Sequence, residues 1–184
     1  MSLNLEDTLN KIKNAYASYY DVNTTDKYDA EQNTVEEGNF MSALFHMHSE
    51  KYVLSKKAQL YQMDTNEYIY FYYYDHLTKS LFDEAVSFSY ELGYPMIKPG
   101  KDHRSSYIGS VFICNSYDED VVLALKKYRK RQNFKFSFYG WMEVHVAMID
   151  LNNEAVITNS DGSNGGKFLK EILFPKKRKK LFYF

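Results

Sequence analysis

The apolar positions of this chain follow a helical period at first and a strand period afterwards. Over residues 5–19 an apolar side chain recurs every three or four positions, which is typical of one face of a helix. These positions are Leu5, Leu9, Ile12, Tyr16 and Tyr19. Asn4 is a candidate N-cap for this helix. Residues 21–39 show no apolar period and are predicted to form a long polar loop.

A period of two begins at Phe40 and predicts β-structure. We expect three strands over residues 40–48, 58–63 and 67–74, with a turn at residues 64–66 between the last two. In the third strand, four tyrosines alternate with three other apolar residues, so both of its faces are expected to be covered. The first set is Tyr68, Tyr70, Tyr72 and Tyr74, and the second is Ile69, Phe71 and Tyr73.

The second half of the chain mixes both periods. Thr78 can cap a helix, and residues 107–114 form an apolar run typical of a central strand. The expected elements are a helix over 79–92, a strand over 107–114, a helix after a capping box at 116–119, strands over 134–139, 141–151 and 155–158 with a bulge or bend at Gly140, and a helix over 167–173. The predicted fold is therefore α/β, a mixed sheet with helices on both faces in the order α-β-β-β-α-β-α-β-β-α.

Length and composition add the domain organisation. The chain has 184 residues, of which 45% are hydrophobic, and this suits one domain with a substantial core. We expect a single domain over residues 1–175 and a basic, aromatic tail over 176–184. Cys114 is the only cysteine and lies in the apolar run, so it is expected to be a buried, inert thiol. A polar N-terminus and the lack of a long apolar run predict a cytosolic protein without a membrane span.

The order of elements over residues 5–150 resembles the restriction-endonuclease-like fold. Such nucleases carry an Asp on the second strand and an Asp/Glu-x-Lys motif on the third, which bind a divalent metal and provide a base. Here residues 59–62 read Gln-Leu-Tyr-Gln and residues 71–74 read Phe-Tyr-Tyr-Tyr. The resemblance therefore implies the fold without the nuclease chemistry, and no catalytic residue is carried over.

A second set of short motifs resembles a family of small uncharacterised proteins of low-GC Gram-positive bacteria. The motifs are Lys56-Lys57-Ala58-x-Leu60, Asn66-Glu67-Tyr68, Asp102-His103 and Gly140-Trp141. The Lys-, Tyr- and Asn-rich composition fits such a genome. This resemblance implies no activity.

Three histidines are candidate metal ligands. His46 and His48 share one side of a predicted strand, and His145, which pairs with Glu143 at the same spacing, could complete a site for zinc or iron. The alternative is a half-exposed strand face whose histidines only form hydrogen bonds. We expect no bound cofactor.

Residues 98–104 form a compact candidate site for an anion or small ligand. A glycine allows close approach of the backbone, and Asp102 could orient His103 for acid–base chemistry. The candidate residues are Lys98, Lys101, Asp102, His103 and Arg104. The alternative is an ordinary solvated connection. A glycine-rich stretch at 161–167 lacks the phosphate-loop spacing and is expected to be a plain turn.

Basic residues concentrate towards the C-terminus. Residues 1–125 carry 10 Lys and Arg against 19 Asp and Glu, a net charge of −9, and residues 126–184 carry 13 against 5, a net charge of +8. We predict a non-catalytic protein that binds nucleic acid or another polyanion through this basic end. The predicted contacts are Lys126, Lys127, Arg129, Lys130, Arg131, Lys176, Lys177, Arg178, Lys179 and Lys180.

Three further interpretations stay open at this point. The aromatic end of the tail would also suit an anionic membrane surface or a partner protein. The segment 98–104 could belong to an enzyme or a ligand sensor. The tyrosine-rich surface could form a homo-oligomer.

Overall fold

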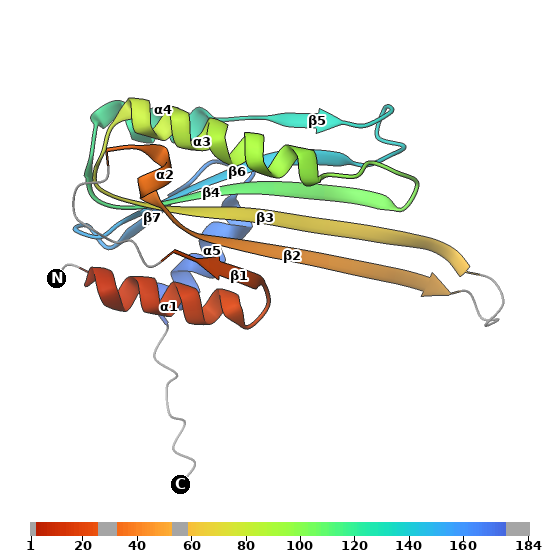
Figure 1. Cartoon of the computed structure of the whole chain (residues 1–184), viewed down its shortest axis with the longest axis horizontal. Coiled ribbons are helices and arrows are strands. Elements are labelled where there is room, and N and C mark those ends of the chain that lie inside the picture. Colours follow the sequence, from red (N-terminus) through yellow and green to blue (C-terminus); the bar gives the residue numbers. More distant parts are fainter. Residues whose placement is uncertain (1–2, 26–32, 53–58, 176–184) are drawn as a thin grey trace, which may run out of the picture.

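A mixed sheet of seven strands organises the protein in its computed structural model, which describes residues 3–25, 33–52 and 59–175 (Figure 1). The strands are β1 (Asp21–Thr24), β2 (Asn39–Tyr52), β3 (Gln59–Leu77), β4 (His103–Tyr117), β5 (Arg131–Asn133), β6 (Trp141–Asp150) and β7 (Ala155–Thr158). The helices are α1 (Leu5–Ala17), α2 (Val35–Gly38), α3 (Lys79–Gly93), α4 (Glu119–Lys127) and α5 (Ser163–Leu173), with a 3-10 turn, η1, at Tyr94–Met96. The predicted α/β class is confirmed.

The strand order in the sheet is β1-β2-β3-β4-β6-β5, and β7 also pairs with β6. β2 lies antiparallel to β1 and β3, whereas β3, β4 and β6 are mutually parallel. β5 pairs with the first residues of β6 and β7 with its last residues, so these two short strands share one edge. Parallel neighbours need a crossover, and α3 and α4 supply the two crossovers.

The two faces of the sheet bury different sets of side chains, as the alternation in β3 predicts. Tyr68, Tyr70, Tyr72 and Tyr74 pack under α2, α3 and α4, and we call this the tyrosine face. Phe71 and Tyr73 pack against α1 and α5 on the opposite side, which we call the cavity face. Figure 1 shows α2, α3 and α4 above the sheet and α1 and α5 below it.

A chain of buried hydroxyls crosses the tyrosine face. Tyr72 Oη lies 2.8 Å from Ser89 Oγ, Ser110 Oγ lies 2.9 Å from the same atom, and Ser89 donates to the Ala85 carbonyl at 3.0 Å. Each buried polar group thereby has a partner, which avoids the cost of desolvating it unpaired. The chain joins β3 and β4 to α3.

Two predicted helix starts are confirmed. The Asn4 side chain accepts a hydrogen bond from the Asp7 N–H at 3.0 Å, and Thr78 Oγ1 accepts one from the Leu81 N–H at 3.2 Å. A side-chain oxygen at each position satisfies an N–H group that the first helical turn leaves without a partner.

One predicted turn and one predicted strand are wrong. Residues 64–66 continue β3 instead of forming a turn, because Asp64 and Asn66 pair with His48 and His46 on β2. Residues 134–139 are not a strand, although phenylalanines alternate there. Lys135, Phe136 and Ser137 have positive φ angles and form the turn between β5 and β6.

The other differences concern boundaries. The predicted loop over 21–39 contains β1 and α2, and α5 begins at Ser163 rather than at 167. Short elements of about four residues carry too few apolar positions to show a period. In the described residues, no helix is long and apolar enough to cross a bilayer.

Candidate cation cavity

A cavity of about 580 Å³ opens on the cavity face of the sheet. Its floor comes from the middle of β3, β4 and β6, where Ile69, Gly109 and His145 lie side by side in register. The end of α1 and the start of α5 form its walls. The cavity therefore lies where the two helices that cover this face leave the parallel strands open.

Three carboxylates line the cavity, one each from β3, β6 and the connection before α5. They are Glu67, Glu143 and Asp161. Glu67 accepts a hydrogen bond from Tyr20 Oη at 2.6 Å. Glu143 pairs with Arg131, and Asp161 lies 3.9 Å from Arg129 Nε. In the described part of the chain, no Lys or Arg side chain pairs with Glu67. Glu67 is therefore the cavity carboxylate that has no Lys or Arg partner among the described residues.

His145 lies among these carboxylates and is partly buried. Its Nε2 is 3.7 Å from Glu143 Oε2, and this nitrogen is buried without a hydrogen-bond partner in the described structure. Burial lowers the pKa of His145 below 6.5, while the charges of Glu143, Glu67 and Asp161 act in the opposite direction. The imidazole is thus neutral near pH 7, and all three carboxylates are close enough to interact electrostatically with it.

Aromatic rings form the rest of the cavity wall. The Tyr16 ring centroid lies 5.0 Å from that of Tyr20 and 5.3 Å from that of Phe168, and Tyr20 lies 5.3 Å from Phe45. Across the cavity, the Tyr107 ring stacks on His145 at 4.7 Å. Burial and the charge of Glu67 both raise the pKa values of the Tyr16 and Tyr20 hydroxyls, so these groups stay neutral hydrogen-bond donors.

The predicted basic cluster borders this cavity, and the structure divides it. Arg129 and Arg131 point to the cavity carboxylates, and the Arg131 guanidinium also lies 5.1 Å from the Trp141 ring centroid. Lys130 Nζ lies 3.2 Å from the centroid of Tyr90 on the other face. Lys126 and Lys127 are exposed at the end of α4. The predicted contacts at 176–180 lie outside the described residues.

The predicted ligand segment 98–104 is also divided. Lys98 and His103 line a separate cavity of about 370 Å³ on the tyrosine face, whereas Lys101, Asp102 and Arg104 are exposed. His103 is buried, and its ring has a partner at each nitrogen. Nδ1 donates to the Tyr139 carbonyl at 2.7 Å, and Nε2 lies 2.9 Å from Ser106 Oγ. His103 therefore holds β4 to the turn after β5.

The structure does not bring the three candidate metal ligands together. His46 and His48 lie on the tyrosine face, where His46 Nδ1 is 2.5 Å from Asn66 Oδ1 and His48 Nδ1 is 2.6 Å from Asp64 Oδ1. His145 lies on the opposite face of the sheet. Among the residues with described positions, no group of three His, Cys, Asp or Glu side chains could hold a metal ion.

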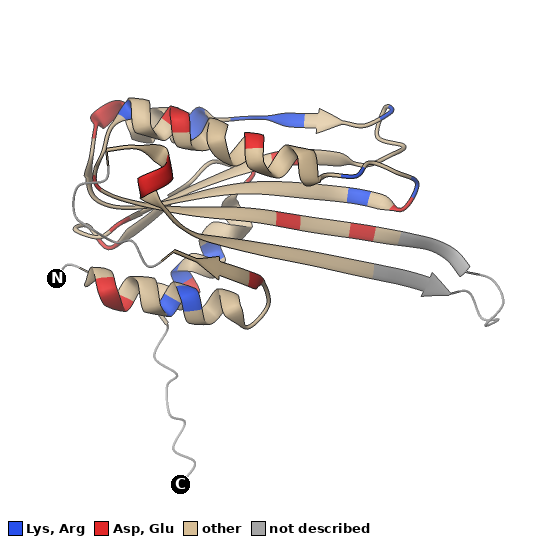
Figure 2. Ribbon diagram, in the orientation of Figure 1, with Lys and Arg blue, Asp and Glu red and all other residues tan. Residues whose placement is uncertain are grey.

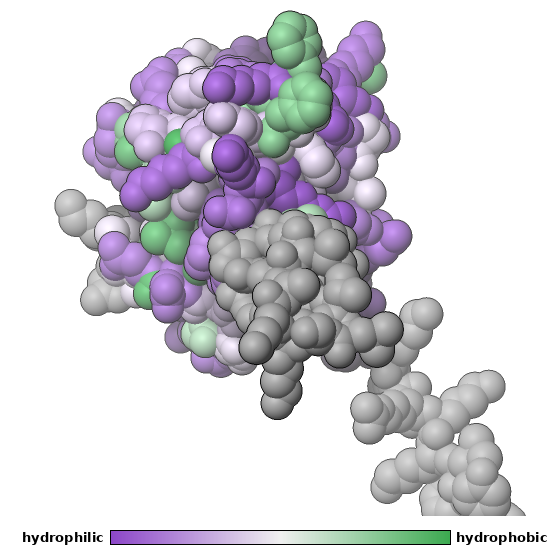
Figure 3. Space-filling view, turned by 90° about the vertical axis from the view of Figure 1, so that its right-hand side faces the viewer, coloured by the Kyte–Doolittle hydropathy of each residue, from purple (hydrophilic) through white to green (hydrophobic). Residues whose placement is uncertain are grey.

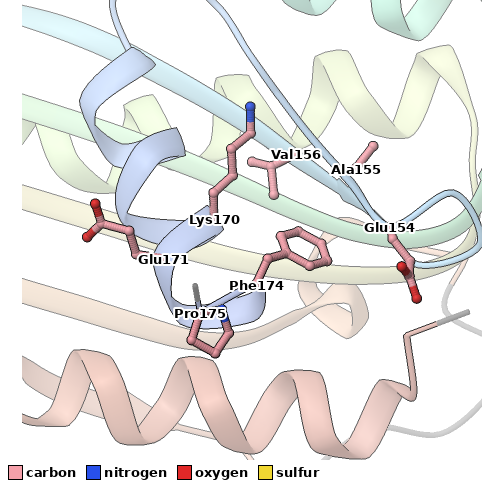
Figure 4. Close-up of a pocket in the computed structure, with 7 residues that line it drawn as sticks. All are labelled: Glu154, Ala155, Val156, Lys170, Glu171, Phe174 and Pro175. Atoms are coloured by element: carbon pink, nitrogen blue, oxygen red, sulfur yellow. The ribbon is translucent and has the colours of Figure 1, made fainter. Parts of the chain in front are cut away.

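A further hollow of about 700 Å³ lies between β7 and the end of α5. Figure 4 shows that its charged side chains, Glu154, Lys170 and Glu171, point in three different directions. Ligand sites place a few polar groups so that they converge. The hollow is larger than the cavity beside His145, but its charged side chains do not converge on one point where a ligand could bind.

Sequence reasoning found part of the cavity. The spacing of two between Glu143 and His145 predicts a candidate ligand pair, and both side chains lie on one side of β6. Glu67, Tyr20 and Asp161 were missed because they come from three separate elements. A lone Glu within an apolar strand was the one available signal at Glu67.

The comparisons with known proteins give one match. A family model described as a domain of unknown function, DUF8052, matches residues 4–171. Neither the curated proteins nor the solved structures contain a match to the chain. These findings do not show the restriction-endonuclease resemblance or an origin in low-GC Gram-positive bacteria.

Proposed function

The chain belongs to the DUF8052 family, whose function is unknown, and we propose from the cavity that it binds a small organic cation. The observation that carries the proposal is Glu67, a carboxylate among aromatic rings whose described partner is the neutral Tyr20 hydroxyl. A cation in the cavity would gain both a charge partner and the negative faces of the surrounding rings.

The surroundings of Glu67 favour a cation over an anion. Three carboxylates line the cavity, whereas the arginines that pair with two of them are not among its lining residues. Asp161 also precedes α5 and offsets the positive end of that helix. Burial lowers the pKa of His145, so this ring is neutral near pH 7 and adds no positive charge that would oppose a cation.

The volume and the wall composition favour an organic ligand over a bare metal ion. A cavity of about 580 Å³ is within the size range of small-molecule sites, which is about 300–1,000 Å³. Aromatic rings and a carboxylate recognise methylated or primary ammonium groups, because the rings attract the charge without hydrogen bonds. We therefore expect amines with an apolar body, of which choline and putrescine are simple probes.

Calorimetric titration with these two cations tests the proposal. We expect saturable binding that the uncharged carbon isostere of choline does not show. Glu67→Gln retains an acceptor for Tyr20 but removes the charge, and it is expected to weaken binding by about tenfold to a hundredfold, the worth of a charged hydrogen bond. Glu36→Gln, on the exposed side of α2, is the matched control and should bind as the wild type does. Equal affinity of the wild type and Glu67→Gln would refute the proposal.

Polyanion binding by the basic cluster, which the charge asymmetry predicts, remains a second and less supported proposal. Arg129 and Arg131 are engaged with acidic groups of the same chain, and Lys130 is stacked on Tyr90. Within the described residues, Lys126 and Lys127 are the two members exposed without such a contact. The predicted homo-oligomer also stays a prediction.

A further inference from the structure

The turn between β5 and β6, residues 134–140, exposes two phenylalanines, and we call this segment the hairpin tip. Phe136 is 96% exposed and Phe138 is 81% exposed, the two highest values among the large apolar side chains of the described residues. Figure 3 shows apolar side chains projecting from this end of the molecule above a mostly hydrophilic surface. Exposed apolar groups at a projecting point indicate a contact with something outside the chain.

The hairpin tip is an ordered structure. Phe134 and Gly140 are joined by a backbone hydrogen bond of 2.9 Å, and three others close the turn, from the N–H groups of residues 138, 139 and 140. Lys135, Phe136 and Ser137 all have φ angles in the left-handed region, between 44° and 71°. Bulky side chains rarely adopt this conformation, and backbone strain of this kind concentrates at functional segments.

Basic residues surround the hairpin tip. Gly140 packs against the start of β4 so closely that a Cβ atom there would lie 2.6 Å from His103 Nδ1, and this contact joins the tip to residues 98–104. Figure 2 shows Lys and Arg positions in the α3–β4 connection, at the start of β4 and in the β5–β6 turn, all at the same end of the sheet. Residues 98–104 and 134–140 hold four Lys and Arg and one Asp, so their net charge is 4 − 1 = +3.

We propose that the hairpin tip docks the protein onto an anionic membrane surface. Phe136 and Phe138 would enter the headgroup region of the bilayer, while the four cations contact lipid phosphates. The cations are Lys98, Lys101, Arg104 and Lys135, all exposed. This site is separate from the cation cavity and does not depend on it.

The shape of the hairpin tip favours a lipid surface over a nucleic acid. Proteins that bind single strands align their cations along a groove that follows the phosphate backbone. Neither Phe136 nor Phe138 lines any of the three cavities described above, and the cations come from separate segments behind a convex point. A convex apolar point surrounded by positive charge is complementary to a deformable anionic surface.

Vesicle sedimentation tests the proposal. Vesicles of phosphatidylcholine with about one-third phosphatidylglycerol should bind the full chain at low salt at least tenfold more tightly than vesicles of phosphatidylcholine alone. The double substitution Phe136→Ser and Phe138→Ser should lower the partition onto anionic vesicles at least tenfold, since each ring loses most of its burial in lipid. Both side chains are exposed, so the variant should unfold at the temperature of the wild type.

A matched control and a competing ligand complete the experiment. Leu123→Ser removes another exposed apolar side chain, 60% exposed on α4, and should leave vesicle binding unchanged. Unchanged vesicle binding by the double phenylalanine variant would overturn the proposal, as would a wild type that does not bind anionic vesicles. A third result would assign the hairpin tip to nucleic acid instead. In that case the wild type does not bind vesicles but binds single-stranded RNA or DNA, and the double phenylalanine variant loses this binding.

Discussion

Replacing Asn159 with alanine should destabilise the fold more than the change of one polar side chain usually does. Asn159 is 1% exposed and follows β7. Its Oδ1 accepts hydrogen bonds from the N–H groups of Val146 at 3.0 Å and Gly162 at 2.9 Å. Its Nδ2 donates to the carbonyls of Val144 at 3.1 Å and Tyr128 at 3.2 Å. One side chain thus joins β6, the end of α4 and the start of α5.

The magnitude follows from the groups that the substitution leaves without partners. Alanine removes the acceptor of two N–H groups, and a buried unpaired donor costs about 1–3 kcal/mol. The Tyr128 carbonyl adds little, because it also accepts a hydrogen bond from Arg129. With two such N–H groups, we expect Asn159→Ala to lower the free energy of unfolding by about 3–4 kcal/mol. This is a large part of the total stability of a domain, which is usually about 5–15 kcal/mol.

Urea denaturation followed by circular dichroism measures this loss. Asn152→Ala is the matched control, because the Asn152 amide is exposed and makes a single described hydrogen bond, to the Asn115 carbonyl. The control should lose less than about 1 kcal/mol, as exposed polar contacts do. A loss below about 1 kcal/mol in Asn159→Ala would contradict the reasoning, since it would mean that the freed N–H groups find other partners.

The remaining predictions concern the backbone, the core and the pH response. Gly140→Ala should cost at least about 2 kcal/mol in urea denaturation, because φ is +75° and a Cβ atom would overlap the Arg104 carbonyl. Tyr72→Phe should cost about 1 kcal/mol in the same assay, because the buried Ser89 hydroxyl loses its contact with Tyr72 and keeps those with Ser110 and the Ala85 carbonyl. Burial lowers the pKa of His145 from 6.5, so the unfolded chain binds the proton at a higher pH than the native chain does. The free energy of unfolding should therefore fall as the pH drops below 6.5, and it should depend less on pH in His145→Gln. Burial raises the pKa of Cys114 to about 12, so iodoacetamide should alkylate the unfolded chain readily and the native chain hardly at all, as mass spectrometry would show.

Period and capping predicted the parts of the fold that are long and amphipathic. The alternation in β3 correctly assigned Tyr68, Tyr70, Tyr72 and Tyr74 to one face and Phe71 and Tyr73 to the other, because both faces of that strand are buried and the side-chain period of two is strict. The same rule failed at 134–139. Phe134 packs against the core, but Phe136 and Phe138 are exposed, so the alternation at these two positions does not correspond to a buried sheet face.

The candidate site was less accessible to sequence reasoning for a geometric reason. Glu67, Tyr20 and Asp161 meet only because the sheet places β3 two strands from β6 and because α1 ends over β3. Sequence spacing reports neighbours on one element and cannot report which elements meet. Charge counts were misleading in a similar way, since Arg129 and Arg131 look like a free basic run but pair with carboxylates of the cavity.

Trp141 is an intrinsic fluorophore that lies close to both proposed sites. The chain holds one Trp, so its emission is a single-site signal that needs no label. Trp141 lies under the Arg131 guanidinium, which also pairs with Glu143 at the cavity, and it begins β6 directly after the hairpin tip. A ligand that displaces Arg131 from Glu143 would change the intensity of this emission. Contact of the hairpin tip with lipid would instead shift its wavelength, so one optical measurement can distinguish the two proposed events.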